Sequence, residues 1–301
     1  MKPAIIAAAA TLSAAIAFSA FAFYSPSIAQ EKAPPGASAT APAAQRAGWE
    51  LVWADEFGDE GLPDPKKWTY ETGFVRNQEK QYYTRARKEN VRVEGGVLII
   101  EGRNERFQKD GKTADYTSAS ITTQGKVSWT YGRIEVRAKL PQGKGVWPAI
   151  WTLGTNIRKI GWPRCGEIDI MEFVGHTPDK VHGTVHWANT DGKHASLGHS
   201  LKAAEPWKDF HIYAIEWTAD TIDFYFDGTK YFTYKVPQAD LPTGNAFRQD
   251  HYLILNLALG GTWGGKIDDS ILPQKYEIDY VRVYQRHSRV QFPPSSTMRL
   301  R

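Results

Sequence analysis

The chain of 301 residues has little cysteine, little net charge and no sustained helical pattern. Cys165 is its single cysteine, so an internal disulfide is excluded, and with no base in its motif this residue is expected to serve packing. The net charge of +4 gives no reason to expect a nucleic-acid partner, because basic residues are dense only in the tail 286–301. The absence of long amphipathic helices and of repeats of 20 to 50 residues argues against helical and solenoid folds.

Three acids stand in an otherwise apolar segment between Gly166 and Phe173. Glu167, Asp169 and Glu172 alternate there with Ile, Met and Phe residues. Burying three carboxyl groups costs on the order of several kcal/mol unless their charge is used or is paired with a basic side chain on a neighbouring strand. An ion pair is the ordinary explanation for one such acid. Three of them so close together favour a functional site.

The geometry of the segment supports that interpretation if the strand contains a one-residue bulge. In a regular strand Glu167 and Asp169 share one face, whereas Glu172 lies on the other. A β-bulge between Asp169 and Glu172 would return Glu172 to the shared face. The Cα atoms of the two glutamates would then lie roughly 13 Å apart, and their carboxyl groups could approach to about 5 to 6 Å. That separation is typical of the carboxyl pair in a retaining glycosidase.

The N-terminal residues predict export. A basic start, an apolar Ala-rich stretch and the small residues before Gln30 are typical of a secretory signal peptide over residues 1–29, with an uncleaved anchor as the alternative. We therefore expect a secreted or periplasmic protein without stable membrane insertion after cleavage. Residues 30–47 are rich in Ala and Pro and predict a linker. The folded domain is expected over residues 48–285, and the tail 286–301 is expected to be a loose end.

The domain shows a period of two, which is typical of strands. Apolar and charged residues alternate from Arg133 to Leu140, and apolar residues alternate with His and Thr from Val181 to Trp187. Hairpin turns are predicted at Gly95-Gly96 and at Asp227-Gly228. Many short strands separated by turns favour an all-β sandwich or barrel.

Aromatic residues are abundant, with 11 Trp, 14 Tyr and 13 Phe, which is more than core packing requires. Several stand in glycine-rich or loop-like contexts, as in the segments 147–151 and 260–265. Any one Trp is more often a core residue, but a group of them also suits sugar rings, whose flat faces stack on aromatic side chains. Together with the acids, they suggest a carbohydrate site.

The chain resembles glycoside hydrolase family 16, in the branch of laminarinase-like endo-β-1,3-glucanases. The segment 167–172 resembles the family's ExDxxE signature. Further matching segments follow in the family's order, at 53–57, 77–84, 131–133, 147–149, 254–261 and 279–284. The resemblance extends from about Trp49 to Tyr284, and several weak motifs in one order are more specific than any single one.

The resemblance implies a β-jelly roll of two curved antiparallel sheets with a concave cleft for a polysaccharide. It also implies that Glu167 is the nucleophile, Glu172 the general acid/base and Asp169 a helper between them. A like charge about 6 Å away contributes roughly 3 kcal/mol at an effective dielectric of about 20, or about 2 pK units. That is enough to keep Glu172 protonated while Glu167 is ionised.

The same resemblance implies which residues contact the sugar and which bind a cation. The polar substrate contacts would be Asn77, Glu135, Arg137, His186 and Asn256, and the stacking aromatics Trp147, Trp151 and Trp263. For Glu135 and Arg137 a cross-strand ion pair is the alternative. One structural calcium, with no part in catalysis, would be bound by Glu56, Gly96 and Asp279.

The expected activity is hydrolysis of β-1,3-glucosidic bonds in a laminarin-type β-glucan by a monomeric, endo-acting, retaining enzyme that needs no catalytic cofactor. The main alternative is another polysaccharide, either mixed-linkage β-1,3-1,4-glucan or a galactan such as agarose or carrageenan. A non-catalytic glucan-binding module would lack one or both glutamates. An adhesion sandwich would need neither the acids nor the tryptophans.

Overall fold

The computed structural model describes residues 46–286. The predicted signal peptide 1–29, all but the last two residues of the 30–47 linker and residues 287–301 of the tail lie outside the described residues, so the expectations for these segments stay predictions. Within residues 46–286, no helix is both long and apolar enough to cross a membrane.

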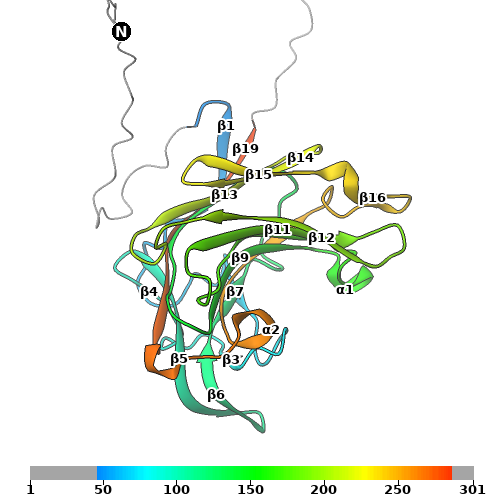
Figure 1. The fold of residues 1–301 in the computed structure, drawn as a ribbon. Coiled ribbons are helices and arrows are strands. Elements are labelled where there is room, and N and C mark those ends of the chain that lie inside the picture. The colour runs from blue at the N-terminus through cyan, green and yellow to red at the C-terminus, as the bar shows by residue number, and fades with distance from the viewer. Residues whose placement is uncertain (1–45, 287–301) are drawn as a thin grey trace, which may run out of the picture. The chain divides into compact units, whose positions relative to one another are not determined.

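Almost all regular structure in the described residues is β-strand, arranged in two large sheets (Figure 1). The first sheet has ten strands, in the order β15 (Thr229–Lys235), β14 (Thr221–Phe226), β13 (His211–Trp217), β8 (Gly132–Lys139), β19 (Gln274–Arg286), β5 (Val97–Lys109), β6 (Lys112–Ser118) and β3 (Gln81–Tyr83), with β1 (Trp49–Asp55) beside β19 and β4 (Val91–Glu94) beside β5. All of its pairings are antiparallel except the short parallel one between β3 and β6.

The second sheet is antiparallel and carries the acidic segment. Its seven strands are, in order, β12 (His194–Lys202), β11 (Lys180–Ala188), β10 (Glu167–Glu172), β9 (Val146–Gly154), β18 (His251–Leu259), β7 (Ser120–Thr122) and β2 (Thr69–Tyr70). The remaining elements are short, namely α1 (Ile157–Ile160), α2 (Gly261–Gly264), η1 (Val236–Ala239), η2 (Asp269–Ile271) and the hairpin of β16 (Asp240–Leu241) and β17 (Gly244–Asn245).

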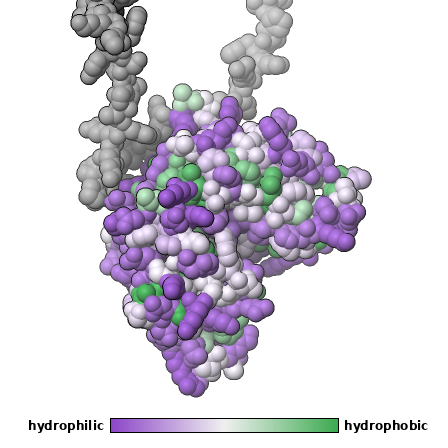
Figure 2. All heavy atoms as spheres, viewed as in Figure 1, coloured by the Kyte–Doolittle hydropathy of each residue, from purple (hydrophilic) through white to green (hydrophobic). Residues whose placement is uncertain are grey.

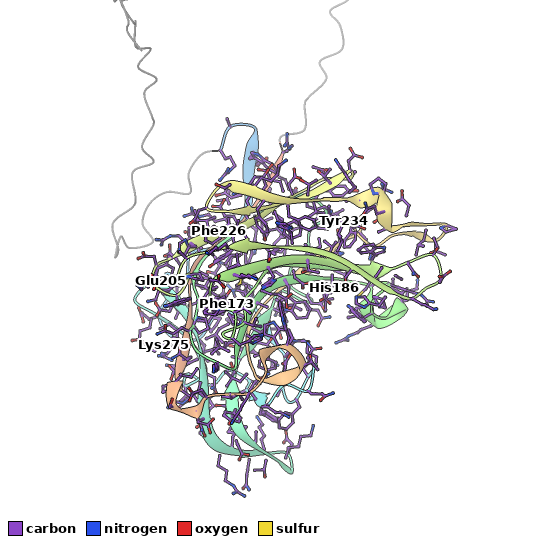
Figure 3. All side chains as sticks on the ribbon, in the orientation of Figure 1. Phe173, His186, Glu205, Phe226, Tyr234 and Lys275 are labelled. Atoms are coloured by element: carbon purple, nitrogen blue, oxygen red, sulfur yellow. The ribbon has the colours of Figure 1, made fainter. Side chains whose placement is uncertain are left out.

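Alternation along the strands builds the core between the two sheets. Ile134 and Val136 of β8 pack in one cluster with Ile168 of β10 and Val185 of β11. The charged residues of β8 therefore occupy the outer face of the ten-stranded sheet. Figure 3 shows Phe226 and Tyr234 on the strands of this sheet and His186 on the other sheet. The predicted all-β jelly roll is confirmed.

Both predicted hairpin turns are present. Gly95 and Gly96 join β4 to β5, and Asp227 and Gly228 join β14 to β15. All four residues have positive φ, as the two-residue turns between right-twisted strands require. On the face shown in Figure 2, hydrophobic residues form small separate groups among hydrophilic ones.

Candidate active site

The predicted bulge in β10 is present and gathers the three acids. On β11, Asp169 pairs with Thr184 and Glu172 pairs with His182, so three residue steps on β10 face two on β11. Ile170 and Met171, which lie between these two acids, are both buried in the core. Glu172 thus returns to the face of Glu167 and Asp169. All three carboxyl groups line one cleft on the outer face of the seven-stranded sheet.

Each acid has a polar neighbour. The indole Nε1 of Trp162 donates a hydrogen bond to Glu167 Oε2 at 2.9 Å. The indole Nε1 of Trp147 donates to Glu172 Oε1 at 3.0 Å. His186 Nε2 lies 3.0 Å from Asp169 Oδ2. Two acids are therefore oriented by tryptophans, and the middle one lies against a histidine.

Burial raises the pKa of all three acids, and repulsion from Asp169 adds to the effect on the two glutamates. Burial, followed by the charge of Asp169, raises the pKa of Glu167 to about 8. Burial raises the pKa of Asp169 to about 7. Burial and the neighbouring charge of Asp169 raise the pKa of Glu172 well above its ordinary value. Because charged carboxylates this close repel one another, the protonated form of Glu172 is favoured beside an ionised neighbour.

The far wall of the cleft comes from the loop that precedes β3. Asn77 has a φ of 55°, which asparagine tolerates, and its side-chain Nδ2 approaches Glu79 Oε1 at 3.4 Å. Tyr83 Oη donates to Glu79 Oε2 at 3.1 Å. Gly261 supports this loop: a Cβ there would lie 2.8 Å from the carbonyl oxygen of Asn77, so only glycine fits. The loop therefore presents a fixed polar surface to the cleft.

Aromatic side chains form the floor of the cleft. Trp151 donates from its indole to Asn256 Oδ1 at 2.7 Å, and the Arg76 guanidinium lies 4.7 Å from the Trp151 ring centroid. Trp263 packs edge-on against Trp147, with ring centroids 5.6 Å apart. The cleft encloses about 340 Å³ and is lined by Arg76, Asn77, Glu79, Trp147, Ala149, Trp151, Leu153, Ile157, Trp162, Glu167, Asp169, Glu172 and Asn256.

Most of the predicted contact residues gather at this cleft. Asn77, Trp147, Trp151 and Asn256 line it directly. His186 contacts Asp169 and Trp263 packs against Trp147, although neither is among the residues that line the cleft.

Glu135 and Arg137 do not reach the cleft, which corrects the expectation that they contact the sugar. They lie on β8, on the outer face of the other sheet. Glu135 pairs with Arg133 at 2.7 Å, and Arg137 pairs with Asp279 at 2.6 Å. The alternation of β8 indicates which face is polar but not which sheet contains the strand. The cross-strand ion pair holds for Arg137, whose partner Asp279 lies on β19, whereas Glu135 pairs with Arg133 of its own strand.

The pairing of β1 and β5 with β19 brings the residues expected to bind calcium close together. Asp55 pairs with Val281, and Leu98 pairs with Ile278, so Glu56 and Gly96 both approach the part of β19 that contains Asp279. Two of the three carry charges that are already paired. Arg282 Nε donates to Glu56 Oε1 at 2.8 Å, and Arg137 holds Asp279 Oδ2. Backbone carbonyls and one carboxylate suit calcium, which would share Asp279 with Arg137.

Three charged or aromatic residues of the cleft were not assigned from the sequence, namely Arg76, Glu79 and Trp162. Glu79 stands within the matching segment 77–84, and Trp162 follows a glycine in the Gly-Trp-Pro sequence 161–163. Those segments were the available signal. Arg76 had none, because a single arginine in a loop is unremarkable until its position over Trp151 is known.

Comparisons with known proteins agree with this geometry. Residues 77–282 match the family Glycosyl hydrolases family 16. The chain is 50% identical over 250 residues to the beta-glucanase of Rhodothermus marinus, covering 79% of this chain and 85% of that protein. The laminarinase structure from Rhodothermus marinus has a TM-score of 0.72 and 48% identity, and covers 80% of this chain and 98% of its own.

A second solved structure adds a bound sugar. It is a non-specific endo-beta-1,3(4)-glucanase co-crystallised with 1,3-beta-D-cellotriosyl-glucose, with a TM-score of 0.75 and 44% identity over 81% of this chain and 98% of that one. Two further relatives are much longer than the matching region. The match spans 34% of the clotting factor G alpha subunit of Tachypleus tridentatus and 38% of the glucan endo-1,3-beta-glucosidase A1 of Niallia circulans.

Proposed function

The chain belongs to glycoside hydrolase family 16, and from this membership and the three acids of its cleft we propose that it is an endo-acting, retaining β-1,3-glucanase. The observation that carries the proposal is the bulge in β10, which places Glu167, Asp169 and Glu172 on one face. The similarity to a laminarinase supports a β-1,3-glucan of the laminarin type as the substrate.

In the first step, Glu172 donates its proton to the glycosidic oxygen while the Glu167 carboxylate attacks the anomeric carbon. The bond from that carbon to the leaving sugar breaks, and a glycosyl ester forms on Glu167. The ester removes the negative charge from Glu167, so the pKa of Glu172 falls.

In the second step, Glu172 accepts a proton from water, whose oxygen attacks the anomeric carbon and releases Glu167. The product keeps the β configuration. Asp169 lies between the two glutamates, and its charge helps to hold the proton on Glu172 before the first step.

The test is proton NMR of the products that the purified protein forms from laminarin, mixed-linkage glucan and agarose. Early appearance of the β anomer from laminarin, lost in Glu167→Gln, is expected. Early release of the α anomer would contradict the nucleophilic role of Glu167. Binding without cleavage would contradict the proposed activity itself.

A second candidate substrate is mixed-linkage β-1,3-1,4-glucan. It is favoured by the similarity to the non-specific endo-beta-1,3(4)-glucanase. Comparing kcat/KM on the two glucans separates the candidates, because a β-1,3-specific cleft would leave the mixed-linkage polymer nearly uncut.

We further propose that residues 1–29 direct export and are removed before Gln30, which would make the protein secreted or periplasmic. The test is the N-terminal mass of the protein recovered from outside the cytoplasm. A mature N-terminus at Gln30 is expected, whereas a full-length protein held in the membrane fraction would favour the anchor.

A structural calcium is also part of the proposal. The backbone oxygens of Glu56 and Gly96 and the carboxylate of Asp279 would bind it and tie β1 and the β4–β5 turn to β19. A saturating ion stabilises the folded state by about 3 kcal/mol at 100 times its Kd, so chelation should lower Tm by roughly 5 °C or more. Calcium should restore the Tm. An unchanged Tm after chelation would contradict the site.

A further inference from the structure

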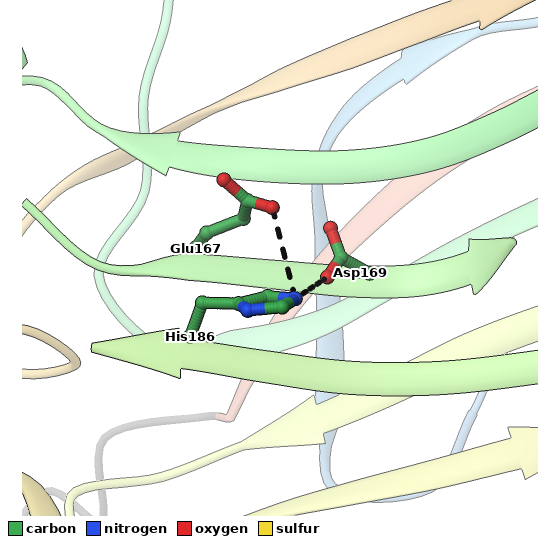
Figure 4. A group of neighbouring side chains, drawn as sticks. All are labelled: Glu167, Asp169 and His186. Carbon is green, nitrogen blue, oxygen red and sulfur yellow. Dashed lines mark ion pairs between the residues drawn. The ribbon is translucent and has the colours of Figure 1, made fainter. Parts of the chain in front are cut away.

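Three atoms at one end of the acidic cluster have the spacing of metal ligands. One carboxylate oxygen each from Glu167 and Asp169 and one ring nitrogen of His186 lie within 4.8 Å of one another (Figure 4). His186 Nε2 is 3.0 Å from Asp169 Oδ2 and 3.9 Å from Glu167 Oε1. Tetrahedral zinc with ligands at 2.0–2.2 Å needs ligand atoms about 3.4 Å apart, which lies between these two distances.

The middle ligand has an unsatisfied oxygen. Asp169 is 3% exposed, and its Oδ2 atom has no well-aligned hydrogen bond even though His186 Nε2 is 3.0 Å away. A buried carboxylate oxygen without a donor is costly. In the tautomer in which His186 carries its proton on Nδ1, Nε2 faces Oδ2 with a lone pair. Two acceptors in this position need a proton or a metal ion between them.

Residues around the cluster hold the ligands as the outer shell of a metal site does. The second ring nitrogen of His186, Nδ1, lies 2.9 Å from Nε2 of His194, which can accept its proton. A metal-bound histidine typically hydrogen-bonds through its other nitrogen in this way. Trp162 occupies Oε2 of Glu167 and so leaves Oε1, the oxygen nearer to His186, for a cation.

The charge of the cleft also favours a cation. Glu79 and Glu172 add their carboxyl groups to those of Glu167 and Asp169, whereas Arg76 is the only basic residue among those that line the cleft. A free coordination position on the metal would face the open cleft, where water can enter.

We propose that Glu167, Asp169 and His186 form a binding site for a divalent transition-metal ion in the substrate-free cleft, and that the bound ion inhibits hydrolysis. One imidazole and two carboxylates are ligands that Zn²⁺ accepts, whereas calcium would need more oxygen ligands. The ion competes with the sugar because it occupies the carboxylate that attacks the anomeric carbon. The binding stands on the geometry alone, and the inhibition rests on the proposed role of Glu167.

The test is isothermal titration calorimetry of the chelator-treated full-length protein with ZnCl₂. We expect one strong site per chain. His186→Ala and Asp169→Asn should each weaken it at least tenfold. The matched control is His182→Ala on the same strand, which removes a histidine opposite Glu172 but no ligand and should change the affinity less than twofold. Circular dichroism establishes that each variant is folded.

Kinetics of the unmodified protein provide a second measurement, which does not depend on the folding of any variant. Zinc should raise the apparent KM, with an inhibition constant equal to the calorimetric Kd. The proposal would be overturned if the unmodified protein had no strong zinc site. It would also be overturned if His186→Ala and Asp169→Asn bound zinc as tightly as the unmodified protein does. Binding at this site without inhibition would overturn the inhibitory part. If zinc binds as expected but no glucan is cut, the metal site stands and the proposed function fails.

Discussion

Strands β8 and β10 both carry acids on the outer face of their sheet, but the acids of the two strands differ in their basic partners. On β8, Glu135 pairs with Arg133 and accepts a hydrogen bond from Tyr280 at 2.9 Å. Within residues 46–286, His186 is the only basic side chain at ion-pair distance from Glu167 and Asp169 of β10. Acids that are neutralised by arginine stabilise the sheet. Acids gathered without such partners keep their protons to unusually high pH and become available for chemistry.

The largest difference between the strands should appear in activity. Glu167→Gln should lower kcat/KM on laminarin by about 10⁴-fold or more, because an amide cannot form the glycosyl ester. Initial-rate assays with matched protein concentrations measure the loss. Glu135→Gln on β8 is the control and should stay within about twofold of the unmodified protein. A similar loss in both variants would show that the comparison between the strands is wrong.

For stability, we expect the substitution on β8 to have a larger effect than the substitution on β10. Glu135→Ala leaves the guanidinium of Arg133, which is 2% exposed, with Glu216 as its remaining carboxylate partner, and should destabilise the domain by about 3 kcal/mol. Urea unfolding of the variant should show a lower midpoint. Asp169→Asn on β10 should not be destabilised in the same way at pH 8, because above its pKa of about 7 it removes a buried carboxylate charge that no arginine or lysine pairs with. An unchanged midpoint for Glu135→Ala would argue against a structural role for the β8 pair.

The pH dependence of stability should distinguish the strands further. The pKa of Glu172 is raised in the folded state, so the folded protein retains a proton that the unfolded chain loses above about pH 4.5. Its contribution to stability is therefore present at low pH and is lost as pH rises. Glu172→Gln should match the unmodified Tm near pH 4 and exceed it by a growing margin as the pH rises toward 8. A Tm advantage that did not grow with pH would contradict this.

The smallest expected effect concerns the orientation of Glu167. Trp162→Phe removes the indole donor that favours the ionised form of Glu167 and lowers its pKa. The acidic limb of the pH profile of kcat/KM should therefore move to higher pH by less than about one unit, with a several-fold loss of rate below pH 7. Rates at pH 9 should be nearly equal. A shift toward lower pH would exclude this role for Trp162.

Much of the site followed from local pattern. The strict alternation in residues 133–140 predicted β8, and the positions of three acids in an apolar run predicted the bulge that the register of β10 confirms. The bulge was predictable because side-chain period and burial are properties of neighbouring residues. The same reasoning placed Glu135 and Arg137 wrongly, because periodicity assigns a face and not a sheet.

The sequence by itself determined the all-β class, the main hairpin turns and the three acids on one face, since each depends on residues a few positions apart. Only the tertiary structure decided which outer face is the cleft. The pairs that matter there are distant: Trp151 meets Asn256, Arg76 covers Trp151, and His186 lies against Asp169. Such contacts depend on the order in which strands pair, and the pKa of each acid depends in turn on the burial and charges that those contacts create.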